Sequence, residues 1–161
     1  MPVTYPASPA SGKTKQNWSP IIQVAVEEVF SMMVGGEAKA VSMPETMSKD
    51  FTAMVGLAGA MCGVFTVICP MQTARAVASS MLGDPSVDNS GVMDAMGEIC
   101  NMVAGNFKAK VAGLADGCML SVPTVVAGAD YEMHSLADGE RFEMCFDFQG
   151  SLISVTLQLN D

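Results

Sequence analysis

The chain has 161 residues, of which 50% are apolar and 16% are charged, so it can form one domain with a sizeable hydrophobic core. Its formal net charge is −9, and its eight Lys and Arg residues are scattered along the sequence. Because binding to a phosphate backbone needs clustered basic side chains, this composition argues against nucleic acid as a partner.

The five cysteines favour buried free thiols over a metal site or a disulfide framework. They are odd in number, form no CxxC pair and lie in apolar runs, and the chain has only one histidine. A zinc site needs clustered Cys or His ligands. No basic segment followed by an apolar stretch suggests a secretory signal. We therefore expect a cytoplasmic protein with reduced cysteines: Cys62, Cys69, Cys100, Cys118 and Cys145.

Residues 1–18 are rich in proline, serine and lysine, which predicts a flexible tail before a single domain spanning residues 19–161. Ser19 and Pro20 predict a helix start, with serine as the N-cap and proline at the first helical position. Apolar residues then recur at helical spacing as far as the glycine pair that begins at Gly35.

The uncharged run at residues 51–69 has two interpretations. As a helix, its nineteen residues would reach about 28 Å, enough to cross a bilayer. However, Gly56, Gly59 and Gly63 would each cost such a helix about 1 kcal/mol. We therefore predict two buried strands joined by a turn at residues 58–60, and no membrane contact.

The middle of the chain predicts one short strand and two helices. Residues 38–43 fit a strand, and residues 70–82 fit a helix closed by Gly83. Residues 88–112 fit a long central helix that Gly113 ends. Its expected buried stripe consists of Met93, Met96, Cys100, Val103 and Phe107.

The C-terminal part predicts an antiparallel pair of strands. Apolar and polar residues alternate strictly over residues 142–148 and again over 153–159, which indicates one buried face and one face exposed to water. Residues 118–126 are extended but interrupted by Pro123, so we expect an edge or connecting segment there. Together these elements predict an α+β domain with long helices packed on one face of an antiparallel sheet.

The central helix carries an unusual ridge of polar and small residues. Positions three and four apart are neighbours on a helix. Asn and Gly are poor residues for a helix interior, and local rules tend to be broken at functional sites. With Gly97 and Ala104 beside it, the ridge would form a low surface that another protein could approach. The alternative is an ordinary solvated face. The ridge comprises Asp94, Glu98, Asn101, Gly105 and Lys108.

The wider pattern favours the functional interpretation. The spacing Asp94-x3-Glu98-x2-Asn101-x21-Pro123 resembles the signature of the CheC/CheX/FliY family of chemotaxis phosphatases. Residues 121–128 resemble the segment that follows the signature helix in the CheX branch. The resemblance covers about residues 19–161 and implies an internally duplicated helix-plus-strands unit.

The first half differs from the second at the position of the signature. Aligning Gly35 with Gly105 places Glu28 opposite Glu98 and Ser31 opposite Asn101. Two-site members of the family carry Glu-x-x-Asn in both helices. Because serine cannot present the donor and acceptor of a carboxamide at the same reach, one active copy is expected, as in the CheX branch.

The resemblance implies hydrolysis of the aspartyl phosphate on a CheY-type response-regulator receiver domain in chemotaxis, a two-component signalling system. Asn101 would orient the attacking water, and Glu98 would dock on the receiver's lysine. The receiver would supply Mg²⁺, so the chain would need no cofactor or metal of its own. Gly105 would allow close approach, Pro123 would shape the neighbouring segment, and Asp94 fits a capping or solvated role equally well.

The resemblance also implies a homodimer, whose contact the C-terminal strands or the edge at residues 118–126 could supply. The main alternative function is a non-catalytic interaction domain of the same fold that binds a receiver or a motor component. A third interpretation is an unrelated dimeric α+β domain in which Glu98 and Asn101 are only solvated.

Overall fold

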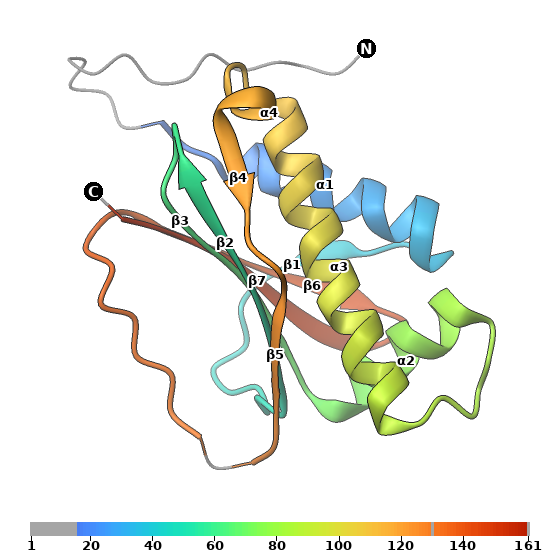
Figure 1. The fold of residues 1–161 in the computed structure, drawn as a ribbon. Coiled ribbons are helices and arrows are strands. Elements are labelled where there is room, and N and C mark those ends of the chain that lie inside the picture. Colours follow the sequence, from blue (N-terminus) through green and yellow to red (C-terminus); the bar gives the residue numbers. More distant parts are fainter. Residues whose placement is uncertain (1–15, 130, 161) are drawn as a thin grey trace.

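The computed structural model describes residues 16–129 and 131–160. Within them, seven strands form one antiparallel sheet in the order β1-β6-β7-β3-β2-β4, and β5 also pairs with β2 (Figure 1). The helical elements are α1 (Ser19–Val29), the π-helical turn η1 (Phe30–Val34), α2 (Met71–Leu82), α3 (Asn89–Lys110) and α4 (Leu114–Gly117). The strands are β1 (Lys39–Val41), β2 (Phe51–Gly59), β3 (Gly63–Cys69), β4 (Cys118–Leu120), β5 (Thr124–Ala127), β6 (Arg141–Phe148) and β7 (Ser151–Leu159).

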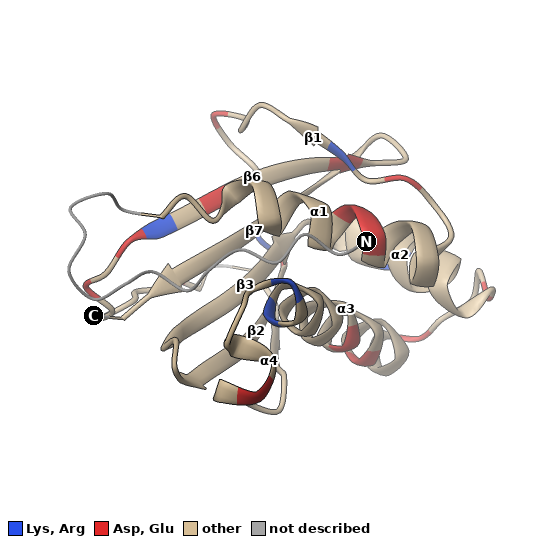
Figure 2. Cartoon of the chain, turned by 90° about the horizontal axis from the view of Figure 1, so that it is seen from above, with Lys and Arg blue, Asp and Glu red and all other residues tan. Residues whose placement is uncertain are grey.

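The three long helices cover one face of the sheet (Figures 1 and 2). Helix α3 packs on β2 and β3, α1 on β6, and α2 on β7. The space between the two layers is filled by fully buried phenylalanines, whose large apolar area makes them the main source of hydrophobic stabilisation. This arrangement confirms the predicted α+β architecture. The phenylalanines are Phe30, Phe51, Phe65, Phe107, Phe146 and Phe148.

The predicted buried hairpin at residues 51–69 is confirmed. Strands β2 and β3 pair from Phe51 with Cys69 to Leu57 with Gly63. Gly59 ends β2 at φ +119°, and a Cβ on it would lie 2.4 Å from the carbonyl oxygen of Gly117. The turn therefore requires glycine there for both conformation and space. In the described part of the chain, no helix is long and apolar enough to span a membrane.

The chain joins the core earlier than the sequence predicts. Trp18, expected to end a flexible tail, is only 4% exposed and meets the ring of Phe107 edge to face at a centroid distance of 5.8 Å. It is also the N-cap, a role predicted for Ser19, whose N–H instead donates to Asn17 Oδ1 at 3.1 Å. Trp18, at the end of the predicted tail, is therefore part of the core. Residues 1–15 of that predicted tail lie outside the described residues.

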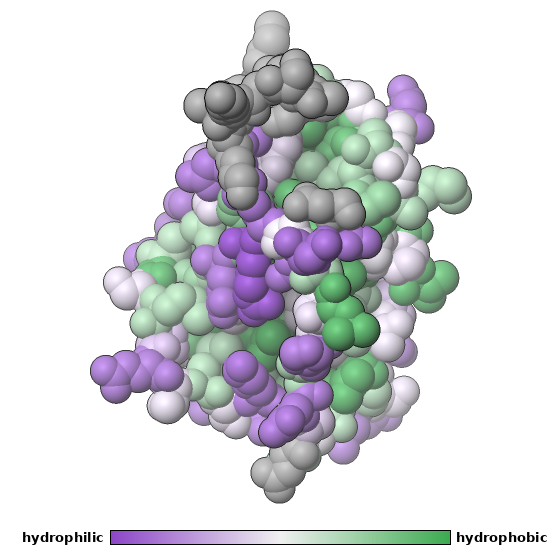
Figure 3. Space-filling model, turned by 90° about the vertical axis from the view of Figure 1, so that its left-hand side faces the viewer, coloured by the Kyte–Doolittle hydropathy of each residue, from purple (hydrophilic) through white to green (hydrophobic). Residues whose placement is uncertain are grey.

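The outer face of the C-terminal strands is covered, contrary to the expectation of a wet face. Ser154, Thr156 and Gln158 are 2%, 2% and 9% exposed. The segment between β5 and β6 crosses this face, and Gln158 Nε2 donates to the carbonyl oxygen of Gly139 at 3.0 Å (Figure 1). His134, the single histidine of the chain, belongs to this irregular segment. Figure 3 views this side, where hydrophilic residues gather at the centre among apolar ones.

Replacing Trp18 by alanine tests whether the first helix depends on this anchor. We expect Trp18→Ala to lower the free energy of unfolding by about 3–5 kcal/mol, because it removes a large buried ring and leaves a cavity. Urea unfolding measures the change, with Val24→Ala, at a residue 41% exposed, as the control. A loss no larger than that of the control would show that Trp18 is not part of the core.

Candidate functional site

Helix α3 is well fixed at both ends, so the side chains in its middle have a rigid support. At the N-terminus, Asp88 caps the helix by accepting from the N–H of Gly91 at 2.7 Å. At the C-terminus, Lys108 and Lys110 lie in the last turn, where cations suit the helix dipole. The observed helix lies within the predicted range of 88–112, and Gly113 follows it in the left-handed conformation.

The structure brings Glu98 and Asn101 together on the outer side of α3. Glu98 is exposed and Asn101 is half-buried, whereas Met96, Cys100 and Val103 on the opposite side are buried. Considering only the described residues, neither Glu98 nor Asn101 has a side-chain hydrogen bond or an ion pair. The carboxylate and the carboxamide are therefore free to bind another molecule. Asp94 is exposed one turn before them (Figure 2, acidic positions in red).

The segment that carries Pro123 packs against α3 one residue before Glu98. A Cβ on Gly97 would lie 3.2 Å from Val125 Cγ2 and 3.5 Å from Pro123 Cβ. Gly97 and the neighbouring Ala104 are buried. The prediction that they form part of an open surface for another protein is therefore wrong, because the chain's own β5 occupies this side of the helix.

The predicted edge segment at residues 118–126 is confirmed, and Ser121 holds it in place. The strand is interrupted between β4 and β5, where Pro123 has no N–H to donate. Ser121 N–H donates to the carbonyl oxygen of Gly56 at 2.9 Å, and Gly56 N–H donates to Ser121 Oγ at 2.8 Å. This side-chain bond keeps the interrupted edge attached to β2. The sequence predicts the interruption at Pro123, but it does not indicate that Ser121 bonds to Gly56.

Gly105 has no close neighbour on the side of α3 that carries the candidate pair. It lies inside α3, and the nearest heavy atom to a Cβ built on it is Leu120 Cδ1 at 3.9 Å. Its place in the middle of a helix costs stability without a packing reason. The expectation that Gly105 allows close approach is compatible with this geometry.

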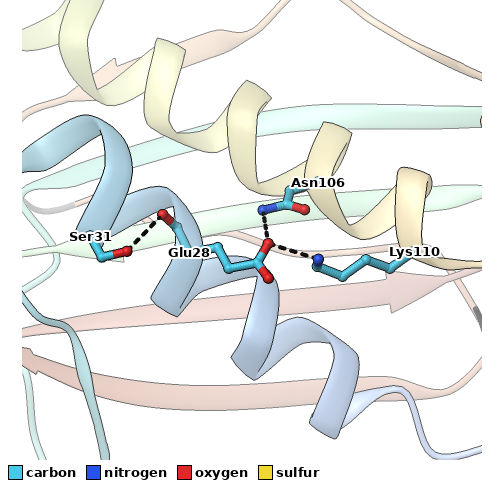
Figure 4. Close-up of polar contacts among 4 residues, drawn as sticks. All are labelled: Glu28, Ser31, Asn106 and Lys110. Atoms are coloured by element: carbon cyan, nitrogen blue, oxygen red, sulfur yellow. Dashed lines mark hydrogen bonds and ion pairs between the residues drawn. The ribbon is translucent and has the colours of Figure 1, made fainter. Parts of the chain in front are cut away.

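In the first half of the chain, the counterpart of Glu98 is already engaged (Figure 4). Glu28 Oε2 lies 2.7 Å from Lys110 Nζ and accepts from Asn106 Nδ2 at 3.0 Å. These two donors on α3 hold the pKa of Glu28 below its ordinary value of 4.5. Glu28 therefore joins α1 to α3. Asn106 and Lys110 lie four residues apart, so they share one face of the helix. This spacing is the only feature of the sequence that indicates the contact with Glu28.

Ser31 is also presented differently from Asn101. It lies in the π-helical turn η1, and its Oγ donates to the carbonyl oxygen of Glu28 at 3.3 Å. Gly35 ends that turn, whereas Gly105, its partner in the sequence alignment, lies inside α3. A π-helical turn has more residues per turn than an α-helix. The side chains of Glu28 and Ser31 therefore differ in relative orientation from those of Glu98 and Asn101.

The candidate pair projects from a helix and lies outside the two hollows that the described residues form on other parts of the surface. A cavity of about 800 Å³ lies on the outer face of the sheet beneath residues 131–135. A hollow of about 350 Å³ lies beside Glu28 and Ser31. Glu98 and Asn101 line neither of them. Because sites for small molecules are concave, a reactant for these residues would have to be carried on the surface of a larger partner.

The cysteines offer little nucleophilic chemistry. Four of the five are buried as expected, but Cys62 is exposed, contrary to prediction. Burial raises the pKa of Cys69 and of Cys100 to about 12, which keeps both thiols protonated near neutral pH. Among the residues that the structure describes, no group of three or more His, Cys, Asp or Glu is placed to hold a metal ion.

The Glu28 contact predicts a pH-dependent part of the stability. A lowered folded-state pKa contributes stability that is fully present above the unfolded value of 4.5 and is lost as pH falls through the folded value. Glu28→Gln should therefore lower the free energy of unfolding at neutral pH, and its difference from wild type should shrink below about pH 4.5. Urea unfolding across this range tests it, with the exposed Glu37→Gln as control. A difference independent of pH would contradict the contact.

Two glycines of α3 form a matched test of the packing. Gly105→Ala should raise the free energy of unfolding by up to about 1 kcal/mol, because alanine is the better helix former and its Cβ would lie at an ordinary van der Waals distance of 3.9 Å from Leu120. Gly97→Ala gains the same propensity but presses on Val125 at 3.2 Å, so it should be less stable than Gly105→Ala. Thermal and urea unfolding compare the two variants. Equal stability would mean that β5 does not pack closely on α3.

Solved structures share this fold over nearly the whole chain. The CheX protein from Vibrio vulnificus is 22% identical with a TM-score of 0.78, covering 92% of this chain and 100% of its own. The CheX protein from Desulfovibrio desulfuricans is 24% identical with a TM-score of 0.77, covering 89% and 99%. A CheX–CheY–BeF3–Mg²⁺ complex from Borrelia burgdorferi matches at 20% identity with a TM-score of 0.71, covering 91% and 100%.

Among curated protein sequences, none matches the chain significantly. The family model described as chemotaxis phosphatase CheX matches residues 51–147, which is more than half of the chain. The matched region includes Glu98, Asn101 and Pro123. This match and the shared fold lead to one conclusion: the chain belongs to the CheX family of chemotaxis phosphatases.

Proposed function

We propose that this chain hydrolyses the aspartyl phosphate of a CheY-type receiver domain in chemotaxis signalling. One observation carries the proposal: in a chain of the CheX family, Glu98 and Asn101 project together from α3 without a bonding partner among the described residues. The Borrelia burgdorferi CheX was solved in a complex with CheY, BeF3 and Mg²⁺, which supports a CheY-type protein as the partner.

Asn101 is the residue that we assign to the chemical step. Its carboxamide can accept from a water and donate to a phosphoryl oxygen without changing its own charge. The water oxygen attacks phosphorus, the bond from phosphorus to the aspartate oxygen breaks, and the carboxylate leaves as inorganic phosphate forms. Little covalent work falls to the protein in such a transfer, so holding the water in line is the main contribution.

Glu98 is assigned to docking. An exposed carboxylate one turn from the carboxamide can pair with the lysine of the receiver's site, and the pair strengthens as the interface excludes water. Gly105 would leave room for the receiver's surface, and Pro123 would hold the flanking segment in place. Asp94 would remain solvated near the rim. Mg²⁺ would come with the receiver, whose concave site would receive the projecting pair.

A homodimer is a further prediction of the same proposal. The sheet order places β6 and β7 between other strands, but β1 pairs with β6 only over residues 145–147, so among the described residues the start of β6 at 141–144 has no strand partner on that side. The predicted edge at residues 118–126 remains available, and β1 is the edge at the opposite end of the sheet. Sedimentation analysis of the purified chain measures its oligomeric state directly.

Loss of phosphate from a phosphorylated CheY-type receiver in Mg²⁺ tests the function. Wild type should accelerate the loss, and Asn101→Ala should reduce kcat by about 100-fold or more, as removal of an oriented dipole does elsewhere. Glu98→Ala should mainly raise KM, because the carboxylate binds the receiver in the ground state as well. Gln72→Ala, at an exposed amide on α2, is the matched control and should behave as wild type.

The outcomes separate the two candidate functions. Binding of the receiver without faster phosphate loss would favour the non-catalytic interaction domain. Unchanged decay on the cognate receiver, with no binding, would rule out both. Circular dichroism and thermal unfolding of each variant establish that a loss of activity is not a loss of fold.

A further inference from the structure

The segment between β4 and β5 lies beside Asn101. Two glycines of α3 mark its course, because Gly105 faces Leu120 and Gly97 faces Pro123 and Val125. Asn101 lies midway between these glycines on the helix. The residues midway between Leu120 and Pro123 must therefore lie level with it. Figure 1 shows β4 and β5 following α3 along this stretch.

Of the two residues at that level, both of which are exposed, Val122 is the one that offers an apolar side chain. Ser121 is bonded to Gly56 through both its backbone N–H and its Oγ. Val122 is 84% exposed. Pro123 and the bonds of Ser121 restrict the backbone here, so Val122 is held out to solvent by a rigid support.

The chemistry of this segment suits the rim of a protein contact. Residues 117–127 contain no charged side chain, whereas the adjoining side of α3 carries Asp94 and Glu98. Energetically important polar contacts are commonly surrounded by apolar ones that exclude water. A water-excluding rim next to Asn101 would strengthen the contact of Glu98 and keep bulk water from the reacting phosphate.

We propose that Val122 is an apolar docking contact for the receiver domain beside Asn101. The proposal rests on the proposed function and deepens it by naming a contact that affects binding and takes no part in the chemistry. Its occupant is the surface of the receiver adjacent to the phosphorylated aspartate. A second copy of this chain is the rival occupant of the same segment.

Val122→Asp tests the proposal in the phosphate-loss assay. We expect KM for the phosphorylated receiver to rise about tenfold with kcat within about threefold of wild type, the pattern of a lost ground-state contact. Val122→Leu keeps an apolar surface and should restore KM. The matched control is Leu136→Asp, at a residue 89% exposed on the segment that covers the outer face, which should leave both constants unchanged.

The failures can be told apart. If Asn101→Ala abolishes activity but Val122→Asp behaves as wild type, the docking contact is wrong and the proposed function stands. If Asn101→Ala retains full activity, the role assigned to Asn101 is wrong, and if wild type does not accelerate phosphate loss, the proposed function itself fails. Sedimentation of wild type and Val122→Asp tests the rival occupant. If wild type is a dimer and Val122→Asp is a monomer, Val122 lies in the contact between two copies of the chain, and the proposal is overturned. Since Val122 is exposed, the variant should keep the thermal stability of wild type.

Discussion

The position of α3 against the sheet is the constraint on which the rest of this structure depends. One side of the helix is fixed by buried rings, with Phe107 meeting Phe65 edge to face at 5.0 Å and Trp18 at 5.8 Å. One flank is held by the ion pair of Lys110 with Glu28, and the other by the contact of Gly97 with Val125. With three sides occupied, the remaining side must face solvent, and that side carries Glu98 and Asn101.

Much of this arrangement could be predicted from the sequence because it depends on local periodicity. The stripe at Met96, Cys100, Val103 and Phe107 fixes which side of α3 is buried, and the polar ridge then follows from helix geometry. The same holds for the hairpin at residues 51–69, where the glycines exclude a long helix. In both cases the structure depends on residues that are close in the sequence, so the pattern of residue types is sufficient to predict it.

What could not be predicted depends on segments that meet only in the folded chain. The sequence predicted a wet face at Thr156 and Gln158 because the segment that covers them, residues 131–140, has no periodic pattern. The sequence predicted that Gly97 belongs to an open surface, because Val125, which packs over it, lies 28 positions later. The engagement of Glu28 likewise depends on Lys110, which lies 82 positions away in the sequence. The local sequence pattern predicts which face of a helix or strand is polar, but it does not predict whether a distant segment of the chain covers that face.

The free side chains of Glu98 and Asn101 have a consequence for the lifetime of any complex. In the isolated chain their rotamers are not fixed by bonds to the described residues, so docking must order both of them. Ordering a side chain at an interface costs about 0.5–1.5 kcal/mol, which is subtracted from the binding free energy. A pair preorganised by internal hydrogen bonds would bind more tightly and dissociate more slowly. The unrestrained pair instead favours brief encounters, which suits a protein that must release one partner before it can act on the next.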